Sequence, residues 1–443
     1  MQLIVRGIFW FGLYAFLVAF PLLVGALSVP RSGSGSLVVD LADGLGYLAF
    51  AMLALEMALV SRMDEATGAF GLDALLQFHR EAGLGALLLA CAHVVLLLST
   101  RGYPLATLGL GGAVPWPIRA GTLAAGSTLL LVGISIGRRR LHLRYEAWQL
   151  LHGLLAVAIV GLGALHVASL GRFSASTPMR VVGVLYLVLF LGVLLRYRVL
   201  RPLALLRRPW TVLSNEAERG DARTIRLSPV GHPGFPFQPG QFCWLNTGRT
   251  PFHLEQHPVS MSSSGEVPPG GAIAFTIRHL GDWSGKVVPA LRPGDRVWVD
   301  GPYGVFSPDR EEGPGYVLVG GGVGVTPLVS MVETLADRED RRPVVLFHGA
   351  HVEADLTLCE RIEALRPRLD LTVVRVLEHP PEGWSGEAGL IDEGVLRRHL
   401  PHEHRRFQYF VCGPAPLMDA MEKVLPTLGI PAGRIHAERF DMV

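Results

Sequence analysis

Runs of apolar residues divide the first 200 residues of the chain into six segments, each close to the roughly 20 residues that an α-helix needs to cross a bilayer. The segments cover residues 8–27, 41–60, 75–98, 118–136, 147–168 and 179–199. This pattern predicts a membrane α-helical bundle of six spans over residues 1–200, with the lipid bilayer as its surroundings.

Beyond a short basic linker at residues 201–209, the hydrophobic period changes. Short β-rich runs such as WTVLS, GQFCWLNT and DRVWVDGPYG alternate with Gly/Pro turns, which is typical of a small antiparallel β-barrel. From Gly315 the order becomes strand, glycine-rich turn, helix and strand, which predicts a parallel sheet with crossover helices. We therefore expect a β-barrel over 210–308 and an α/β domain over 309–443.

The charge distribution separates the same two halves. Up to Arg208 there are 17 arginines, no lysine and 8 acidic residues, a net charge of +9. The remainder has 23 basic and 30 acidic residues, a net charge of −7. A basic membrane half joined to an acidic soluble half gives no indication of nucleic-acid binding.

Arginine placement predicts the orientation in the membrane. With the N-terminus inside, twelve arginines of the membrane half fall in inner segments and five in outer ones, which favours a cytoplasmic soluble half. A bacterial host would make this the inner membrane, and the compact loops favour that over a eukaryotic plasma membrane. The alternative that residues 26–28, Ala-Leu-Ser, end a signal peptide would leave five spans with the same orientation.

Glu56 is an acidic residue within the second span. Its carboxylate either handles protons or pairs with an arginine near the membrane surface, and we favour the arginine pairing. The four cysteines are scattered without disulfide or zinc spacing, and no C-x-x-C-H sequence for covalent haem attachment occurs.

Four histidines occupy the third and fifth spans at equal spacing. His79 and His93 are fourteen positions apart, as are His152 and His166. Fourteen helical steps return to within roughly 40° of the starting direction and advance about 21 Å, so each pair shares one helix face. Because the two spans run the same way, His79 should face His152 and His93 should face His166. A single intramembrane histidine can merely bond a neighbouring helix, but the duplicated spacing predicts two bis-histidine sites for two b-type haems.

Residues 257–264 read HPVSMSSS and come before the predicted strand AIAFTIRHL. The barrel and the nucleotide domain together resemble the ferredoxin–NADP reductase family. The whole chain, from about residue 40 onward, is similar to the ferric reductase and NADPH oxidase superfamily. With the motifs that follow it, HPVSMSSS resembles the flavin motif of that superfamily in its histidine-first form. The resemblance implies that FAD binds in the barrel, with contacts from His257, Pro258, Val259, Ser260, Ser263, Thr276, Arg278, Gly281, Trp283 and Ser284. From the sequence alone, Arg278 is equally well explained as an ordinary charge at a strand edge.

The stretch GGGVGVTP at 320–327 follows a predicted strand and opens a helix. Glycines let the backbone approach a pyrophosphate, and a helix N-terminus supplies amide donors, but the spacing is not the G-x-G-x-x-G fingerprint of Rossmann dehydrogenases. The resemblance implies a pyridine-nucleotide loop formed by Gly320, Gly321, Gly322, Gly324, Thr326 and Pro327. It also places the nicotinamide beside Cys412, Gly413 and Pro414, although Cys412 could equally be a strand-end core residue.

Two further positions concern the coenzyme. The superfamily covers its flavin with an aromatic ring near the C-terminus, which implies a catalytic role for Phe440 beside Cys412. The residues 441–443 extend beyond that ring, so the cover can differ here. Discrimination of the 2′-phosphate normally involves arginine, but His351 stands at that position. The resemblance favours NADPH, with NADH as the alternative.

Together these features predict a transmembrane oxidoreductase, an NAD(P)H oxidase or ferric-chelate reductase. Electrons would pass from NAD(P)H through FAD and two b-type haems to an acceptor across the membrane. That acceptor is oxygen, giving superoxide, or a ferric chelate, or alternatively a periplasmic protein partner. Two rival functions are a membrane-anchored flavin reductase without haem, and an ion or proton channel regulated by a nucleotide. The channel leaves the histidine spacing unexplained.

Overall fold

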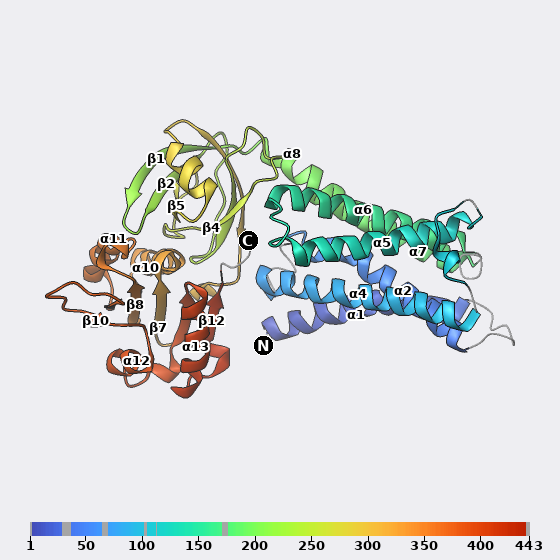
Figure 1. Cartoon of the computed structure of the whole chain (residues 1–443). Helices are drawn as coiled ribbons and strands as arrows, with labels where there is room; N and C mark the ends of the chain where they lie inside the picture. Colours follow the sequence, from blue (N-terminus) through green and yellow to red (C-terminus); the bar gives the residue numbers. More distant parts are fainter. Residues whose placement is uncertain are drawn as a thin grey trace. The chain divides into compact units, whose positions relative to one another are not determined.

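The computed structural model describes residues 2–28, 37–63, 70–101, 104–111, 113–170 and 176–439. Contacts divide the chain into two compact units, residues 1–201 and 202–443. We call them the membrane unit and the soluble unit (Figure 1). The division falls at the start of the expected linker.

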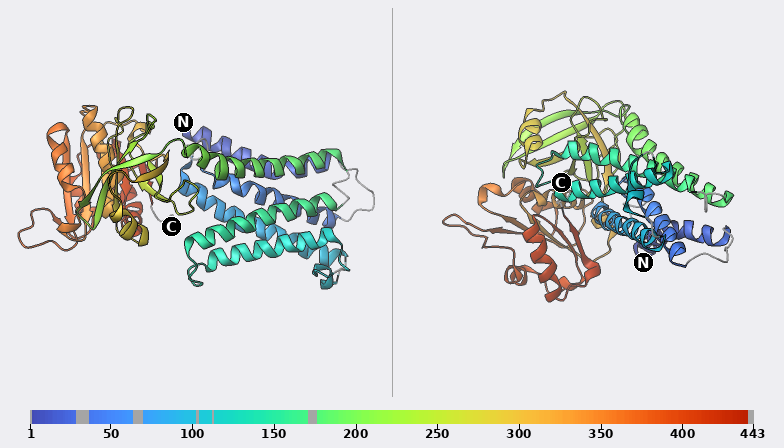
Figure 2. Two further views of the ribbon diagram at one scale, coloured as in Figure 1. Left: turned by 90° about the horizontal axis from the view of Figure 1, so that it is seen from above. Right: turned by 45° about the vertical axis from the view of Figure 1, so that its right-hand side comes forward.

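Within its described residues, the membrane unit contains six long apolar helices, as predicted, and each is long and apolar enough to cross a membrane. They lie alongside one another in both further views (Figure 2). Their bounds are α1 (Gln2–Ser28), α2 (Leu37–Leu59), α4 (Leu72–Arg101), α5 (Trp116–Gly137), α6 (Tyr145–Ser169) and α7 (Thr177–Leu195), with a short helix η1 (Leu105–Leu108) between α4 and α5.

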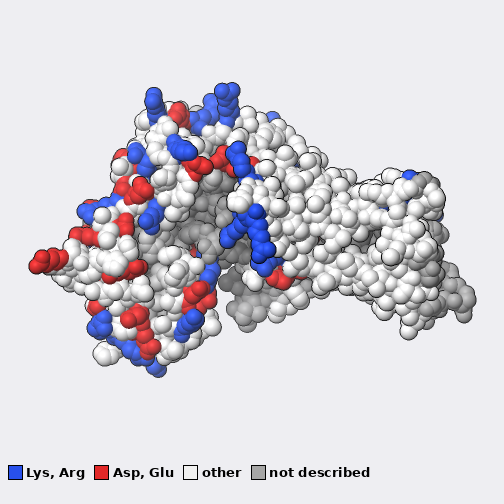
Figure 3. All heavy atoms as spheres, viewed as in Figure 1, with Lys and Arg blue, Asp and Glu red and all other residues white. Residues whose placement is uncertain are grey.

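The surface of these helices is apolar. Leu88 is 70% exposed and Val188 is 59% exposed, and very few charged side chains appear along the helices on the face shown in Figure 3. Such a surface is stable in hydrocarbon, not in water. The buried core of the membrane unit, around Phe50, Tyr186 and Phe190, is small. The chain is therefore a multi-pass membrane protein.

The expected linker at 201–209 is partly helical. The last span continues from α7 through a π-helical turn, η2 (Arg196–Leu200), into α8 (Arg201–Leu205). The first barrel strand begins at Trp210, so the connection between membrane helix and barrel contains only four residues outside regular structure.

The first part of the soluble unit is an antiparallel barrel, in agreement with the prediction. Its strand order is β4-β3-β6-β1-β2-β5, and a bridge between Met261 and Phe275 joins the two edges. The elements are β1 (Trp210–Glu218), β2 (Ala222–Pro229), β3 (Phe242–Asn246), β4 (His257–Ser260), β5 (Ile273–Arg278), η3 (Trp283–Val287), α9 (Val288–Ala290) and β6 (Arg296–Tyr303).

The second part is the predicted parallel sheet, entered through η4 (Pro308–Arg310), where the expected boundary at 308/309 lies. Its order is β10-β9-β8-β7-β11-β12, with one hydrophobic cluster on each face. The elements are β7 (Tyr316–Gly321), η5 (Gly322–Gly324), α10 (Val325–Asp337), β8 (Val344–Ala350), η6 (Glu353–Asp355), α11 (Cys359–Leu365), η7 (Arg366–Arg368), β9 (Leu371–Leu377), β10 (Glu387–Ala388), α12 (Glu393–His399), η8 (His404–Arg406), β11 (Gln408–Cys412), α13 (Ala415–Thr427), η9 (Ala432–Arg434) and β12 (Ile435–Glu438).

Candidate functional site

The structure brings the four membrane histidines together as two pairs. The ring centroids of His79 and His152 are 6.2 Å apart, and those of His93 and His166 are 6.3 Å apart. The helices α4 and α6 therefore run in the same direction, as the spacing required. We call the two groups the His79 pair and the His93 pair.

In the His93 pair, both rings are fixed by backbone carbonyl groups. Nδ1 of His93 lies 2.8 Å from the carbonyl oxygen of Ala42, and Nδ1 of His166 lies 2.7 Å from that of Pro117. A carbonyl oxygen only accepts hydrogen bonds, so each Nδ1 must carry the proton. Nε2 of each ring is left with its lone pair.

In the His79 pair, the partners are side chains. Nδ1 of His152 lies 3.2 Å from the hydroxyl oxygen of Ser135. That hydroxyl donates its own proton to the carbonyl of Leu131 and also accepts from the indole of Trp148. Ser135 must therefore accept from His152, because a hydroxyl has one proton to give.

His79 contacts Glu56 of α2, and its Nδ1 lies against a carboxylate oxygen of Glu56, which can accept a hydrogen bond from it. The side chain of Glu56 is 12% exposed. The prediction favoured an arginine as its partner, whereas the contact that the structure shows is with a histidine. This contact depends on which faces of α2 and α4 pack together. The hydrophobic pattern of the sequence does not determine which residues of two spans are in contact.

These contacts fit haem ligation by all four rings. Each Nδ1 faces an acceptor, which is the usual arrangement of a metal-binding histidine, and Nε2 remains as the ligand atom. Two metal–nitrogen bonds of about 2 Å, plus the short distance from each ring centre to its nitrogen, add up to roughly 6 Å between ring centres. Both observed separations agree with that sum.

Two glycines let neighbouring helices approach the His93 pair. A Cβ added at Gly46 would lie 2.9 Å from Nδ1 of His93, and one added at Gly121 would lie 2.5 Å from Nδ1 of His166. Any larger residue would push the ring away. The sequence did not predict a role for these glycines or for Ser135, and it did not connect Glu56 with His79.

In the barrel, the expected flavin motif forms β4 and the turn after it. The hydroxyl of Ser260 is buried and has no hydrogen-bond partner among the described residues. A buried hydroxyl without a partner is costly, and hydrogen bonding to a flavin edge would satisfy it. Val259 is likewise buried, whereas His257 and Pro258 are only partly so.

Thr276 and Ser263 have partners within the protein. Thr276 donates its hydroxyl proton to Ser262 at 3.0 Å, and its oxygen is 2.9 Å from the hydroxyl of Thr224. The hydroxyl of Ser263 accepts from the amide of Ala274 at 3.1 Å. These hydroxyls hold β2, β5 and the segment after β4 together.

The segment after β5 is organised around Trp283 and Ser284. The indole ring of Trp283 stacks on His257 with centroids 3.9 Å apart and planes at 15°. The hydroxyl of Ser284 accepts from the amides of Leu280 and Gly281 at 2.9 and 3.1 Å. The stacked pair joins the flavin motif to this turn.

Arg278 lies at the end of β5 beside the glycine-rich loop. A Cβ at Gly322, whose φ is +54°, would be 3.4 Å from a guanidinium nitrogen of Arg278. The side chain thus bridges barrel and parallel sheet. A cation next to a glycine-rich loop can neutralise the charge of a bound pyrophosphate. The position of Arg278 beside Gly322 therefore favours a binding role over an ordinary charge at a strand edge.

The two nucleotide loops are in direct contact. Cys412 pairs with Gly320 in the register of β11 and β7, and a Cβ at Gly324 would lie 2.5 Å from the carbonyl oxygen of Cys412. A Cβ at Gly321 would lie 3.1 Å from Pro414, and one at Gly413 would lie 3.2 Å from the amide nitrogen of Gly321. The glycines are needed for this packing as well as for access to a ligand.

Thr326 and Pro327 begin the helix that follows the loop, and both are buried. The Thr326 hydroxyl donates to the carbonyl of Val323 at 2.6 Å, which stabilises the turn. Cys412 itself is fully buried at the end of β11.

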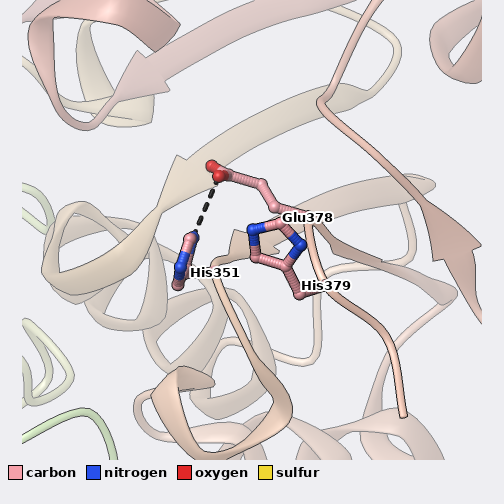
Figure 4. A group of neighbouring side chains, drawn as sticks. All are labelled: His351, Glu378 and His379. Carbon is pink, nitrogen blue, oxygen red and sulfur yellow. Dashed lines mark hydrogen bonds and ion pairs between the residues drawn. The ribbon is translucent and has the colours of Figure 1, made fainter.

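His351 follows β8, and the register of β8 with β9 brings two distant residues next to it. Nδ1 of His351 is 3.0 Å from the carboxylate of Glu378, and the rings of His351 and His379 are 4.5 Å apart (Figure 4). All three are exposed. The expected 2′-phosphate position therefore carries a carboxylate as well as the histidine.

The end of the chain supplies residues that were not predicted. Phe440 lies outside the described residues. Before it, Glu438 is buried, and a Cβ at Gly304 would lie 3.4 Å from its carboxylate. His436 stacks on Phe410, with centroids 4.8 Å apart, and burial lowers the pKa of His436 to about 4.

Two family models match the chain. The model described as the ferric reductase like transmembrane component matches residues 45–163, and the oxidoreductase NAD-binding domain matches residues 318–423. The first includes His79, His93 and His152 and ends three residues before His166. The second includes both nucleotide loops.

Curated relatives match about half of the chain. The reductase component of propane 2-monooxygenase from Rhodococcus jostii is 30% identical over 228 residues, which is 50% of this chain and 60% of the relative. The flavohemoprotein of Deinococcus radiodurans is 32% identical over 244 residues, covering 53% and 59%. The chain thus spans about 60% of the length of these relatives.

Among solved structures, the Amycolatopsis cytochrome P450 reductase GcoB is similar to 53% of this chain, with 26% identity and a TM-score of 0.47. The match covers 69% of that structure.

Proposed function

We propose that this chain, which belongs to the ferric reductase and NADPH oxidase superfamily, carries electrons from NAD(P)H across a membrane by way of FAD and two b-type haems. Its two matched domains make it a membrane oxidoreductase that uses NAD(P)H and FAD. The proposal adds the haems, the direction of transfer and the acceptor.

The observation that carries the proposal is the arrangement of the four histidines. Every Nδ1 faces an acceptor, and the rings form two pairs at separations that suit iron between them. When bound, FAD would accept two electrons as hydride and release them singly to the haems, which exchange one electron each. His79 and His152 would hold one haem, and His93 and His166 the other.

In the soluble unit, the residues bind and orient. Ser260 offers its buried hydroxyl to the flavin, and Arg278 offers positive charge beside Gly322. The loops at 320–324 and 412–414 form a backbone surface for the nicotinamide nucleotide at adjacent strand ends, where ligands of such sheets bind. Phe440 would cover the flavin.

The His79 pair lies on the side of the membrane unit from which the chain leaves for the soluble unit. His152 is near the start of α6, and α7 returns antiparallel to end there before Arg201. We therefore propose that the His79 pair would hold the haem that receives electrons first, and the His93 pair the haem that receives them second. With the arginine distribution, this order supports our proposal that the soluble unit is cytoplasmic in a bacterial cell and that the acceptor is outside.

The residues around His351 bear on the choice between NADH and NADPH. A 2′-phosphate there would meet the carboxylate of Glu378, and like charges repel, so we propose NADH as the preferred donor and NADPH as the weaker one. The superfamily resemblance favoured the opposite order.

The test is an optical spectrum of the detergent-purified chain, recorded before and after NADH is added under argon. We expect reduction of low-spin b-type haem, with two haems and one FAD per chain. Reoxidation rates with oxygen and with a ferric chelate then identify the acceptor. A protein that binds flavin but no haem, even when haem is supplied, would instead be a membrane-anchored flavin reductase.

A further inference from the structure

The two histidine pairs differ in what their Nδ1 atoms contact. In the His93 pair both acceptors are backbone carbonyls, which carry no net charge. In the His79 pair one acceptor is the Ser135 hydroxyl and the other is the carboxylate of Glu56. Glu56 therefore distinguishes the two pairs chemically.

Glu56 is well placed to act on His79 alone. Its carboxylate is 12% exposed, and the ring that it contacts is 25% exposed. It belongs to α2, the same helix whose Ala42 carbonyl accepts from His93 fourteen residues earlier. One helix thus presents a neutral acceptor to one histidine of α4 and an acidic acceptor to the other.

We propose that Glu56 is a positioning residue that holds His79 and lowers the reduction potential of the haem at the His79 pair below that of the haem at the His93 pair. This inference rests on the proposed function. A carboxylate that accepts from Nδ1 increases electron donation from Nε2 and so stabilises the oxidised iron. A backbone carbonyl, which carries no net charge, increases this electron donation less.

The consequence is a direction for electron transfer. Electrons that enter at the His79 pair move to a haem of higher potential at the His93 pair, which is a downhill step away from the flavin. Without Glu56 the two sites would have neutral acceptors throughout and more similar potentials.

The experiment is a spectroelectrochemical titration of the full-length protein, with haem content measured on the same sample. For E56Q we expect the lower of the two midpoints to rise, with the reduction equilibrium shifted about tenfold, or about 59 mV for one electron. The upper midpoint should stay in place. The matched control is S135A, which removes a neutral acceptor from the same pair and should shift the lower midpoint less.

The possible results separate the two proposals. A wild-type protein without two haems contradicts the proposed function. Two haems in E56Q with both midpoints unchanged contradict the role of Glu56. If E56Q retains only one haem, E56D decides: a second haem with a low midpoint supports the proposal, and loss of that haem from E56D as well contradicts it.

Discussion

The membrane unit and the soluble unit use different parts of the chain to build their sites. In the membrane unit the candidate ligands are side chains, four histidines on two helices. Their acceptors are backbone carbonyls at the His93 pair and side chains at the His79 pair. In the soluble unit the backbone itself forms the candidate binding surface, at glycines where an added Cβ would lie 2.5 Å from Cys412 or 2.8 Å from Leu417.

This difference shows why the two sites appear so differently in the sequence. A ligand set made of side chains on helices repeats with the helical period, so fourteen-residue spacing is informative by itself. A surface made of backbone is visible only as glycines, which have many other uses in turns. Substitutions that damage one site should therefore leave the other working, and four measurements test this separation.

The largest effect is expected for H166L. Removing one axial ligand should eliminate the haem at the His93 pair and reduce NADH-driven acceptor reduction by about 100-fold or more, because even outer-shell changes at metal sites cost about 10–100-fold. Flavin reduction by NADH should remain normal. Haem content reports on the membrane unit, and stopped-flow flavin absorbance reports on the soluble unit. A lower rate of flavin reduction by NADH in H166L would contradict the independence of the two sites.

Acid should destabilise the soluble unit first. His348 is fully buried in β8, and burial lowers its pKa to about 4. An unfolded histidine takes up a proton near pH 6.5, so stability is lost as pH falls from about 6.5 towards 4, by roughly 2–4 kcal/mol. Thermal unfolding of full-length protein, followed by flavin release, should show this slope. H348L should make the slope shallower but not remove it, because burial also lowers the pKa of His436 to about 4. An unchanged slope would contradict the assignment to His348.

A smaller effect is expected for G324A. The added Cβ would press on the carbonyl of Cys412 and spread the two nucleotide loops, so we expect the apparent KM for NADH to rise about tenfold. The haem spectrum after chemical reduction should match wild type. G433A is the control, because a Cβ there meets nothing within 4 Å. Equal kinetics for both variants would show that the loop contact is unimportant.

The smallest effect concerns coenzyme choice. In E378Q the negative charge beside His351 is removed, so kcat/KM for NADPH relative to NADH should increase roughly three- to tenfold, a range limited by solvent screening. E382Q changes an exposed acid in the same loop region and should leave the ratio unchanged. No change in E378Q would place the discrimination elsewhere.

Much of the fold was predictable, because hydropathy identifies membrane spans and alternation identifies the barrel. The pairing of His79 with His152 was predictable from helical period and topology. The partners of those histidines were not, since Glu56 and Ser135 depend on which faces of neighbouring helices meet. Likewise, Glu378 is 27 residues from His351, and only the parallel register of β8 and β9 brings them together.

The internal use of Thr276 also could not be predicted. A hydroxyl in a strand next to a flavin motif looks like a ligand contact, yet the adjacent strand supplies Thr224 and the motif supplies Ser262. Cross-strand neighbours are set by register, which alternation alone leaves undetermined.

The glycines beside the His93 pair repeat one arrangement on two hairpins. Gly46 follows Ala42 by four residues and Gly121 follows Pro117 by four, and in each case the earlier residue gives its carbonyl to the histidine that the glycine adjoins. Residues four apart lie one above the other on a helix. Helices α2 and α4 therefore form one version of a module, and α5 and α6 form another. A glycine four residues after an acceptor, opposite a histidine-bearing helix, is a signature by which unrelated membrane sequences can be searched for the same module.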